Sequence, residues 1–378
     1  MVEKFQTIER ELQAQHLERK QVVRLVLTAL LARTNLVLLG PPGTGKSRLA
    51  RDLCRRIGGQ FFEWLLGQMT TLEEVLGPIS LRGLEEDNYY RKTTHKLPEA
   101  HIAFLDEVFK SSSALLNSLL GILNERVFHN DGIVQQVPLE MVIGASNELP
   151  ENREDLAALW DRFPVRYVLD YLKDGDAFTA MLDIAATPAG GTTMTLDELH
   201  ASQAEVAAIP YTDIKPSVLE LREKLRQQGV VISDRRYHDL MRVLQANAWL
   251  NGHTTVEPGD CEILRFCLWN EPEQTKTVGK TVFELFNPME GEAQEARDNA
   301  YEMYQEALSV SSEDSTEMMK KAMEANKGLQ SVARRLKEVV AVADAQGKSH
   351  ETADQALADI AKWSKEVMDR CMAATPSI

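Results

Sequence analysis

The chain has 378 residues, 44% of them hydrophobic and 26% charged, which is ordinary for a globular protein of two or three domains. The net charge of −15 and the lack of a dense Lys/Arg run argue against a protein that neutralises many nucleic-acid phosphates. No apolar run approaches the ~18 residues of a membrane span, and the four cysteines lack metal-ligand spacing, so we expect a cytoplasmic protein without a membrane span.

The first half of the chain predicts helices that are followed by alternating strands and helices. Residues 1–33 read as helical, with apolar residues on one face. Short apolar strands are then predicted at 36–39, about 61–65, 102–105, 140–145 and 165–169. This alternation predicts an α/β fold with a doubly wound, mostly parallel sheet, in which ligands bind at the carboxyl ends of the strands.

The first predicted strand runs into a glycine-rich segment that matches the nucleotide-binding pattern G-x-x-x-x-G-K-[ST]. A helix is predicted directly after it, so backbone N–H groups and the positive end of a helix dipole would face one anion. We expect Lys46 to reach the β- and γ-phosphates of ATP or GTP, and the Ser47 hydroxyl to bind Mg²⁺. The residues of this expected site are Gly40, Pro41, Pro42, Gly43, Thr44, Gly45, Lys46 and Ser47.

Two carboxylates end the strand predicted at 102–105. Asp106, at the strand tip, is placed to hold Mg²⁺ directly or through water. Glu107 is the natural general base for the water that attacks the γ-phosphate. Acidic pairs are common at strand ends, but one that follows a phosphate-binding loop at this distance predicts hydrolysis as well as binding.

Three polar features follow further along the chain. Asn147 comes after the strand at 140–145, where its amide would lie near the attacking water. Arg162 stands just before the strand at 165–169, and the segment 233–236, Ser-Asp-Arg-Arg, opens a helix.

The segment 126–134 reads as a hairpin with an Asp-Gly turn.

The rest of the chain predicts helices. A helical region extends from about 171 to 286, and beyond it the sequence has no proline between Pro288 and Pro376. Three heptad-like stretches with alanine-rich seams predict an antiparallel three-helix stack there. Such a stack would serve as a rigid arm or docking surface, or pack against the rest of the protein; the sequence leaves both open.

Together these motifs resemble those of the AAA+ ATPases, and within them the MoxR group, with its RavA branch the most similar. The resemblance covers roughly residues 10 to 270 and is carried by GPPGTGKS (40–47), LPEAHIAFLDE (97–107), LLNSLLGILNER (115–126), GASNELPE (144–151), LWDRF (159–163) and SDRR (233–236). It implies an AAA+ nucleotide-binding core at 1–170, a helical lid domain at 171–286 and a C-terminal helical domain at 287–378.

The resemblance also implies roles for individual residues. Asn147 matches the sensor-1 residue, and Arg162 matches the arginine finger that a neighbouring subunit supplies to the γ-phosphate. Arg235 best matches sensor 2, with Arg236 and Arg166 as neighbours that could share or take over these roles. The alternative for Arg162 is a surface salt bridge at a helix end.

The assembly implied by the resemblance is a ring of identical subunits, usually a hexamer, with ATP and Mg²⁺ at each subunit interface. Such rings act as chaperone-like remodellers of a protein client, typically with a partner that bears a von Willebrand factor A domain. In related rings the insert at 76–92 and the hairpin at 126–134 face the central pore. The alternative function is a nucleic-acid motor or loader, such as a restriction translocase subunit, and a third is a passive ATP-bound binding platform.

Overall fold

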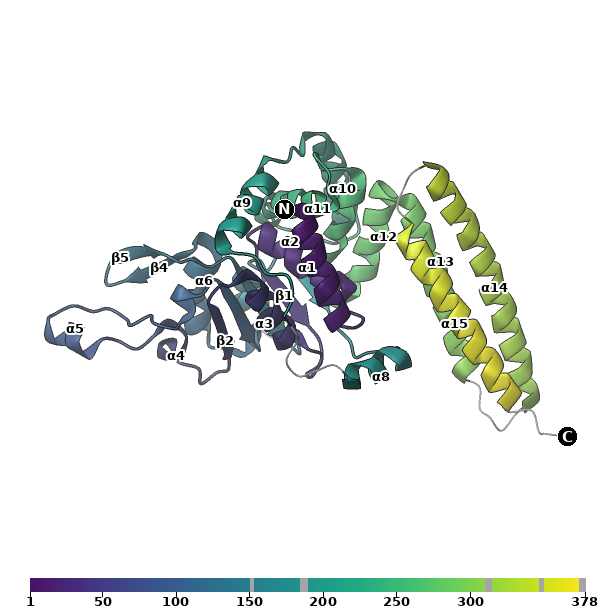
Figure 1. Ribbon diagram of the computed structural model, residues 1–378, viewed down its shortest axis with the longest axis horizontal. Coiled ribbons are helices and arrows are strands. Elements are labelled where there is room, and N and C mark those ends of the chain that lie inside the picture. The colour runs from purple at the N-terminus through teal and green to yellow at the C-terminus, as the bar shows by residue number, and fades with distance from the viewer. Residues whose placement is uncertain (150–152, 184–189, 310–314, 347–349, 374–378) are drawn as a thin grey trace. The chain divides into compact units, whose positions relative to one another are not determined.

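The computed structural model describes residues 1–149, 153–183, 190–309, 315–346 and 350–373 (Figure 1). The chain forms two compact units, Met1–Val278 and Gly279–Ile378. The first unit holds a parallel sheet and its covering helices, whereas the described part of the second unit is helical. Among the described residues, no helix is long and apolar enough to cross a membrane.

The five predicted strands form one parallel sheet, which confirms the predicted fold class. Their order is β2-β3-β6-β1-β7, so the strand that leads into the glycine-rich loop has a neighbour on each side. β1 and β6 are buried along their whole length, which explains why they read as continuous apolar runs rather than alternating ones. The bounds are β1 (Leu36–Leu39), β2 (Phe61–Leu65), β3 (Ile102–Asp106), β6 (Met141–Ser146) and β7 (Val165–Val168).

Helices cover this sheet and extend beyond it. The predicted N-terminal helical region consists of two helices, of which α2 is apolar and almost completely buried from 22 to 31. α3 turns Leu49, Leu53 and Ile57 inward, as their spacing predicts. The helices of the first unit up to β7 are α1 (Val2–Gln15), α2 (Lys20–Leu31), α3 (Lys46–Ile57), α4 (Leu72–Leu76), α5 (Leu81–Glu85), α6 (Ser113–Glu125) and α7 (Arg153–Trp160), with short 3₁₀ turns η1 (Leu97–Glu99) and η2 (Val108–Lys110).

The chain after β7 is helical, as predicted. These elements are α8 (Gly175–Asp183), α9 (Leu196–Ala208), η3 (Thr212–Ile214), α10 (Lys215–Gln227), α11 (Asp234–Asn251), η4 (Pro258–Phe266), η5 (Pro272–Gln274) and α12 (Thr275–Phe286). Their starts carry ordinary capping signals: the Ser233 hydroxyl accepts the Arg236 N–H at the start of α11, and Thr195 forms a capping box with Glu198 at α9.

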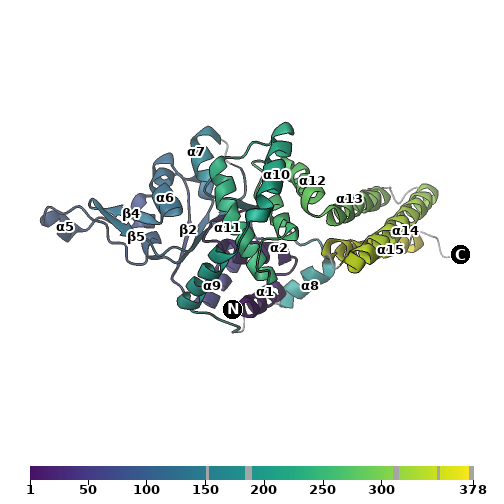
Figure 2. The ribbon, with the colours of Figure 1, turned by 90° about the horizontal axis from the view of Figure 1, so that it is seen from above.

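Two insertions project together from one side of the first unit (Figures 1 and 2). The predicted hairpin is present as β4 (Val127–Asn130) and β5 (Ile133–Gln136), joined by Asp131 and Gly132, whose positive φ angles of 53° and 73° suit a two-residue hairpin turn. Asn130 accepts the Arg91 N–H at 2.7 Å and donates to the Arg91 carbonyl at 3.1 Å. Asp131 accepts the Tyr89 N–H at 3.2 Å. We call residues 77–92 and 127–136 the arm.

The second unit begins within α12 and continues as the predicted stack of three helices: α13 (Pro288–Ser309), α14 (Ser315–Gln346) and α15 (Glu351–Ala373). Small alanine side chains dominate its core, and Leu329, Leu336 and Ile360 fill the remaining space. The ion pair between Arg297 and Asp359 joins the first helix to the third. The predicted polar breaks at 311–315 and 346–349 lie for the most part outside the described residues.

One buried side chain connects four segments of the first unit. The Asn35 amide donates to the carbonyls of Leu123 and Arg162, at 3.1 and 3.0 Å. Its oxygen accepts from the Val142 N–H and the Arg126 guanidinium, both at 3.1 Å. Asn35 is 3% exposed, so these hydrogen bonds are shielded from water. It links the start of β1 to the end of α6, the start of β6 and the approach to β7.

We predict that Asn35→Ala lowers the free energy of unfolding by roughly 3 kcal/mol, because it leaves several buried polar groups without a partner. Urea unfolding with an unchanged slope measures the loss. Asn124→Ala, on the exposed face of α6, is the matched control and should stay within about 0.5 kcal/mol. A loss at Asn35 no larger than that at Asn124 would contradict the connecting role.

Candidate functional site

The carboxyl ends of the central strands bring the predicted nucleotide-site residues to one edge of the sheet. Leu39 pairs with Ser146 of β6 and with Val168 of β7. Directly after β1, the Gly40 N–H donates to the Ser146 carbonyl at 3.0 Å. The loop from 40 to 45 therefore leaves the sheet between two strands and enters α3 at Lys46. This is the edge at which parallel α/β sheets bind ligands.

Glycine is required in this loop for two different reasons. Gly40 has φ 141°, and a Cβ there would lie 2.2 Å from the Leu169 carbonyl oxygen, so no side chain fits. Gly43 and Gly45 have φ angles of 80° and 86°, which other residues rarely adopt. Gly45 is the N-cap of α3, so the N-terminal N–H groups of that helix open toward the loop. The loop has the backbone of an anion-binding turn.

Lys46 is 8% exposed although it carries a charge. Its ammonium donates to the Gly40 carbonyl at 2.6 Å, to the Pro41 carbonyl at 3.1 Å and to Asn147 Oδ1 at 3.3 Å. Burial lowers the pKa of Lys46, and the carboxylates of Asp106 and Glu107 oppose that shift. The structure thus brings Lys46 together with the two carboxylates and the amide that the sequence predicts.

Glu107 and Asn147 form the second half of this arrangement. Asn147 Nδ2 donates to Glu107 Oε1 at 2.5 Å, so Lys46, Asn147 and Glu107 lie in one chain of hydrogen bonds. Glu107 has a φ of 51°, which lies in the left-handed region that is unfavourable for residues other than glycine. Its N–H donates to Asp106 Oδ1 at 3.0 Å. Strain of this kind at the carboxyl ends of parallel strands makes Glu107 a candidate functional residue.

Lys110 is a site residue that the sequence reasoning missed. Its ammonium lies 3.2 Å from Glu107 Oε2, an ion-pair contact without the geometry of a hydrogen bond. The signal was available: Lys110 is three residues after Glu107, and the 3₁₀ turn η2 brings such positions to the same side. The sequence did not show that residues 108–110 form a 3₁₀ turn, which is what places Lys110 beside Glu107.

The predicted magnesium ligands are a hydroxyl and a carboxylate. Ser47 is the second residue of α3 and accepts a long hydrogen bond from Arg51 at 3.4 Å, while Asp106 is partly exposed at the end of β3. Among the described residues, no three His, Cys, Asp or Glu side chains cluster in a way that could hold a metal. Mg²⁺ prefers few protein oxygens together with phosphate and water, so Ser47 and Asp106 fit this ion.

Arg162 and Arg235 lie apart from this hydrogen-bonded chain. Arg162 Nη1 donates to the Ala158 carbonyl at 3.1 Å, and its buried Nε has no hydrogen-bond partner in the described part of the chain. Arg235 is exposed at the start of α11. Burial lowers the pKa of Arg162, and the nearby Arg235 guanidinium lowers it further. Two like charges therefore stand side by side.

Arg166 and Arg236, the predicted alternatives, have structural partners instead. Arg166 is completely buried in β7, donates to the carbonyls of Phe163 and Trp160 at 2.9 Å, and stacks 4.1 Å from the Trp160 ring centroid. Arg236 pairs with Asp161 at 2.9 Å. Both guanidinium groups also bond to Trp269 and Asn270, which joins β7 and α11 to the segment after η4. These arginines hold the helical region against the sheet.

Comparisons with known proteins agree with this arrangement. The family model for the MoxR domain of MoxR-vWA-beta-propeller ternary systems matches residues 3–207, and an AAA lid domain model matches residues 213–282. The model of the MoxR domain covers more than half of the chain.

Similar proteins match most of the chain. An uncharacterized protein of Methanocaldococcus jannaschii, MJ0812, is 34% identical over 96% of this chain and 98% of its own length. A second one, MJ0079, is 37% identical over 76% of each chain. A crystal structure of a candidate ATPase from Cytophaga hutchinsonii shares the fold, with a TM-score of 0.62 and 17% identity over 76% of this chain and 95% of its own. The chain belongs to the MoxR family of AAA+ ATPases.

Proposed function

We propose that this protein binds ATP with Mg²⁺ and hydrolyses it to ADP and phosphate. The observation that carries the proposal is the chain of hydrogen bonds from Lys46 through Asn147 to Glu107. It places a cation, an amide and a carboxylate at the mouth of a loop built to hold an anion. These are the parts that phosphoryl transfer to water requires.

In this proposal each residue has a separate task. The loop N–H groups and Lys46 hold the β- and γ-phosphates, and Lys46 exchanges the Gly40 and Pro41 carbonyls for phosphate oxygens. Ser47 and Asp106 would hold Mg²⁺, which neutralises charge on the phosphates. Asn147 fixes the orientation of Glu107, and Glu107 accepts the proton of the water that attacks the γ-phosphate.

We predict that Glu107→Gln lowers the ATPase rate about 10²- to 10⁴-fold with little change in ATP affinity, because the amide keeps the shape but cannot take a proton. Single-turnover hydrolysis and equilibrium binding of a fluorescent ATP analogue measure the two effects. Glu125→Gln, the same change at an exposed position in the last turn of α6, is the matched control. An unchanged rate in Glu107→Gln would remove Glu107 as the base.

We further propose that hydrolysis takes place at the subunit interfaces of a homo-oligomeric ring, usually a hexamer in such families. Arg162 would act as the finger toward the neighbouring subunit's nucleotide, and Arg235 as sensor 2. Two observations support this: Arg162 has an unpartnered buried nitrogen in the described residues, and neither arginine bonds to Glu107 there. A partially buried guanidinium with spare donors suits the charge on a transferring phosphoryl group.

We predict that Arg162→Ala abolishes turnover, with ATP affinity retained. Mixing it with Lys46→Ala subunits should restore part of the activity, because a ring then contains intact sites built from both variants. The rate per subunit should also rise with protein concentration as rings form, which mass photometry follows on the same samples. Arg226→Ala, an exposed arginine of α10, is the control. Confirmed mixed rings without rescue would contradict action between subunits.

The same proposal includes the domain bounds of the chain, its location in the cell and its partners. We propose an AAA+ core at 1–170, a lid at 171–286 and a C-terminal helical domain at 287–378, in a protein of the cytoplasm that is most similar to the RavA branch. The proposed client is a protein, reached with a partner that bears a von Willebrand factor A domain. The support for that partner is the matching family model, which is described from systems that combine MoxR and vWA domains.

We predict that tagged Glu107→Gln protein, purified from its own cells with ATP, carries a vWA-domain protein that is depleted when ADP replaces ATP. Mass spectrometry identifies the bound proteins, and Lys46→Ala serves as the control that cannot hold the nucleotide. Recovery without any vWA-domain protein in either nucleotide would contradict the partnership. ATPase stimulation by DNA or RNA would instead favour the nucleic-acid motor, which the net charge of −15 disfavours.

A further inference from the structure

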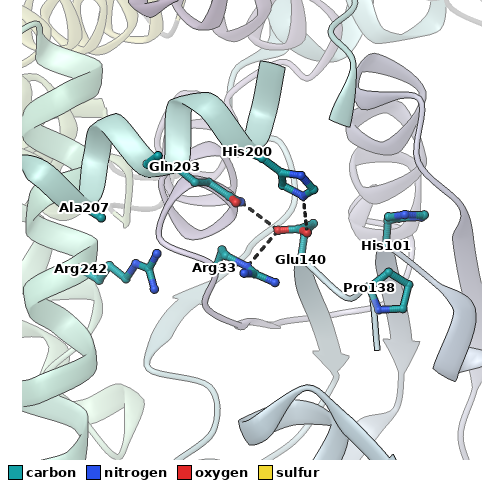
Figure 3. Close-up of a pocket in the computed structure, with 9 residues that line it drawn as sticks. Arg33, His101, Pro138, Glu140, His200, Gln203, Ala207 and Arg242 are labelled. Atoms are coloured by element: carbon teal, nitrogen blue, oxygen red, sulfur yellow. Dashed lines mark hydrogen bonds and ion pairs between the residues drawn. The ribbon is translucent and has the colours of Figure 1, made fainter. Parts of the chain in front are cut away.

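A second site lies at the opposite edge of the sheet from the nucleotide loop. It is a cavity of about 420 Å³ at the amino ends of β3 and β6, where His101 and Glu140 directly precede the two strands (Figure 3). α9 supplies His200 and Gln203, and α11 supplies Arg242. The length of a five-residue strand, roughly 17 Å, separates it from the site at the carboxyl ends. It shares no residue with that site.

Among the described residues that line this cavity, the acidic side chain is Glu140, and its charge is already compensated. Glu140 is 2% exposed, and its Oε1 lies 2.9 Å from His200 Nε2. Its Oε2 accepts from Gln203 at 3.0 Å and pairs with Arg33 at 3.1 Å. Both carboxylate oxygens are thus engaged, as a buried carboxylate requires. Figure 3 shows these three partners converging on Glu140.

The two arginines of the cavity, Arg33 and Arg242, carry only donors. Arg242 lines it with an exposed guanidinium for which the described residues offer no hydrogen bond or ion pair, and Arg33 faces the same space. His101 Nδ1 accepts the Gln60 N–H at 3.0 Å, which leaves the proton of the neutral ring on Nε2. Burial lowers the pKa of His101. The cavity therefore has two positively charged guanidinium groups and one carboxylate, whose oxygens both already have partners.

We infer that this cavity binds a small phosphate-type oxyanion between Arg33 and Arg242. Guanidinium groups present forked donors that match the oxygens of such an anion and bind it more strongly than neutral donors do. The volume is in the range of small-molecule sites and leaves room for a modest organic group attached to the phosphate.

The position of the anion gives it a structural role as well. Arg33 belongs to the part of the chain matched by the MoxR domain model, and Arg242 belongs to the part matched by the lid model. An anion held by both would add a bond between these two parts at the edge of the sheet that ATP does not occupy. The site thus extends the proposed ATPase function without depending on it.

Isothermal titration with inorganic phosphate tests the site, with a non-hydrolysable ATP analogue and Mg²⁺ present to fill the β- and γ-phosphate positions of the glycine-rich loop. We expect one site per chain, weakened at least about tenfold by Arg242→Gln, because a charge-assisted contact is lost. Arg242→Lys should weaken it less. Arg226→Gln, an exposed arginine of α10 outside the cavity, should leave it unchanged.

Three results would overturn the inference. The first is no saturable binding by the unaltered protein at millimolar phosphate and constant ionic strength. The second is binding that persists in Arg242→Gln and disappears in Lys46→Ala, since it would then belong to the glycine-rich loop. The third is equally tight binding of acetate, which would replace the phosphate class by carboxylates. Because Arg242 is exposed, circular dichroism of Arg242→Gln should match the unaltered protein.

Discussion

The parallel register of β1 between β6 and β7 is the constraint on which the site depends. Residues that follow these strands are forced to the same edge, and the bond between the Gly40 N–H and the Ser146 carbonyl continues the ladder one step beyond β1. A parallel sheet cannot be built from local hairpins, so Lys46 and Asn147 meet only because the chain crosses over between strands. Chemistry at this edge is a consequence of topology.

Burial of the Lys46 ammonium carries an electrostatic cost. The protein offsets it with two backbone carbonyls, the Asn147 amide and two nearby carboxylates, rather than with a single ion pair. The charge is thereby kept without a fixed anionic partner in direct contact. A phosphate oxygen can then replace a carbonyl without breaking a salt bridge.

Much of the fold and the centre of the site could be predicted because their signals are local. The glycine pattern, the strand that ends in Asp106 and Glu107, and the Asp131-Gly132 turn each depend on neighbouring residues, and the structure brings them where they were expected. Side-chain partners over long separations could not be predicted. Arg166 bonds to Trp269, 103 residues away, and a sequence does not say which of two adjacent arginines, 235 or 236, turns inward.

The same limit explains why the cavity at the amino ends of β3 and β6 could not be predicted from the sequence. Arg33, Glu140, His200 and Arg242 come from four separate segments and have no common spacing, so only the folded chain brings them together. Isolated histidines and arginines in a sequence are most often surface residues. Arg33 has a positive φ of 51°, a conformation that an arginine does not lead one to expect from the sequence.

The hydrogen bonds between Asn130 and Arg91 give the arm a mechanical property that neither insertion has alone. Each insertion is attached to the rest of the first unit by two chain segments. The joined pair is therefore held at four points, whereas a single loop would be held at two. One insertion continues through 93–101 into β3, and the other through 137–140 into β6. The two insertions are thus continuous with the two strands that end beside Glu107 and Asn147, which are themselves joined by a hydrogen bond.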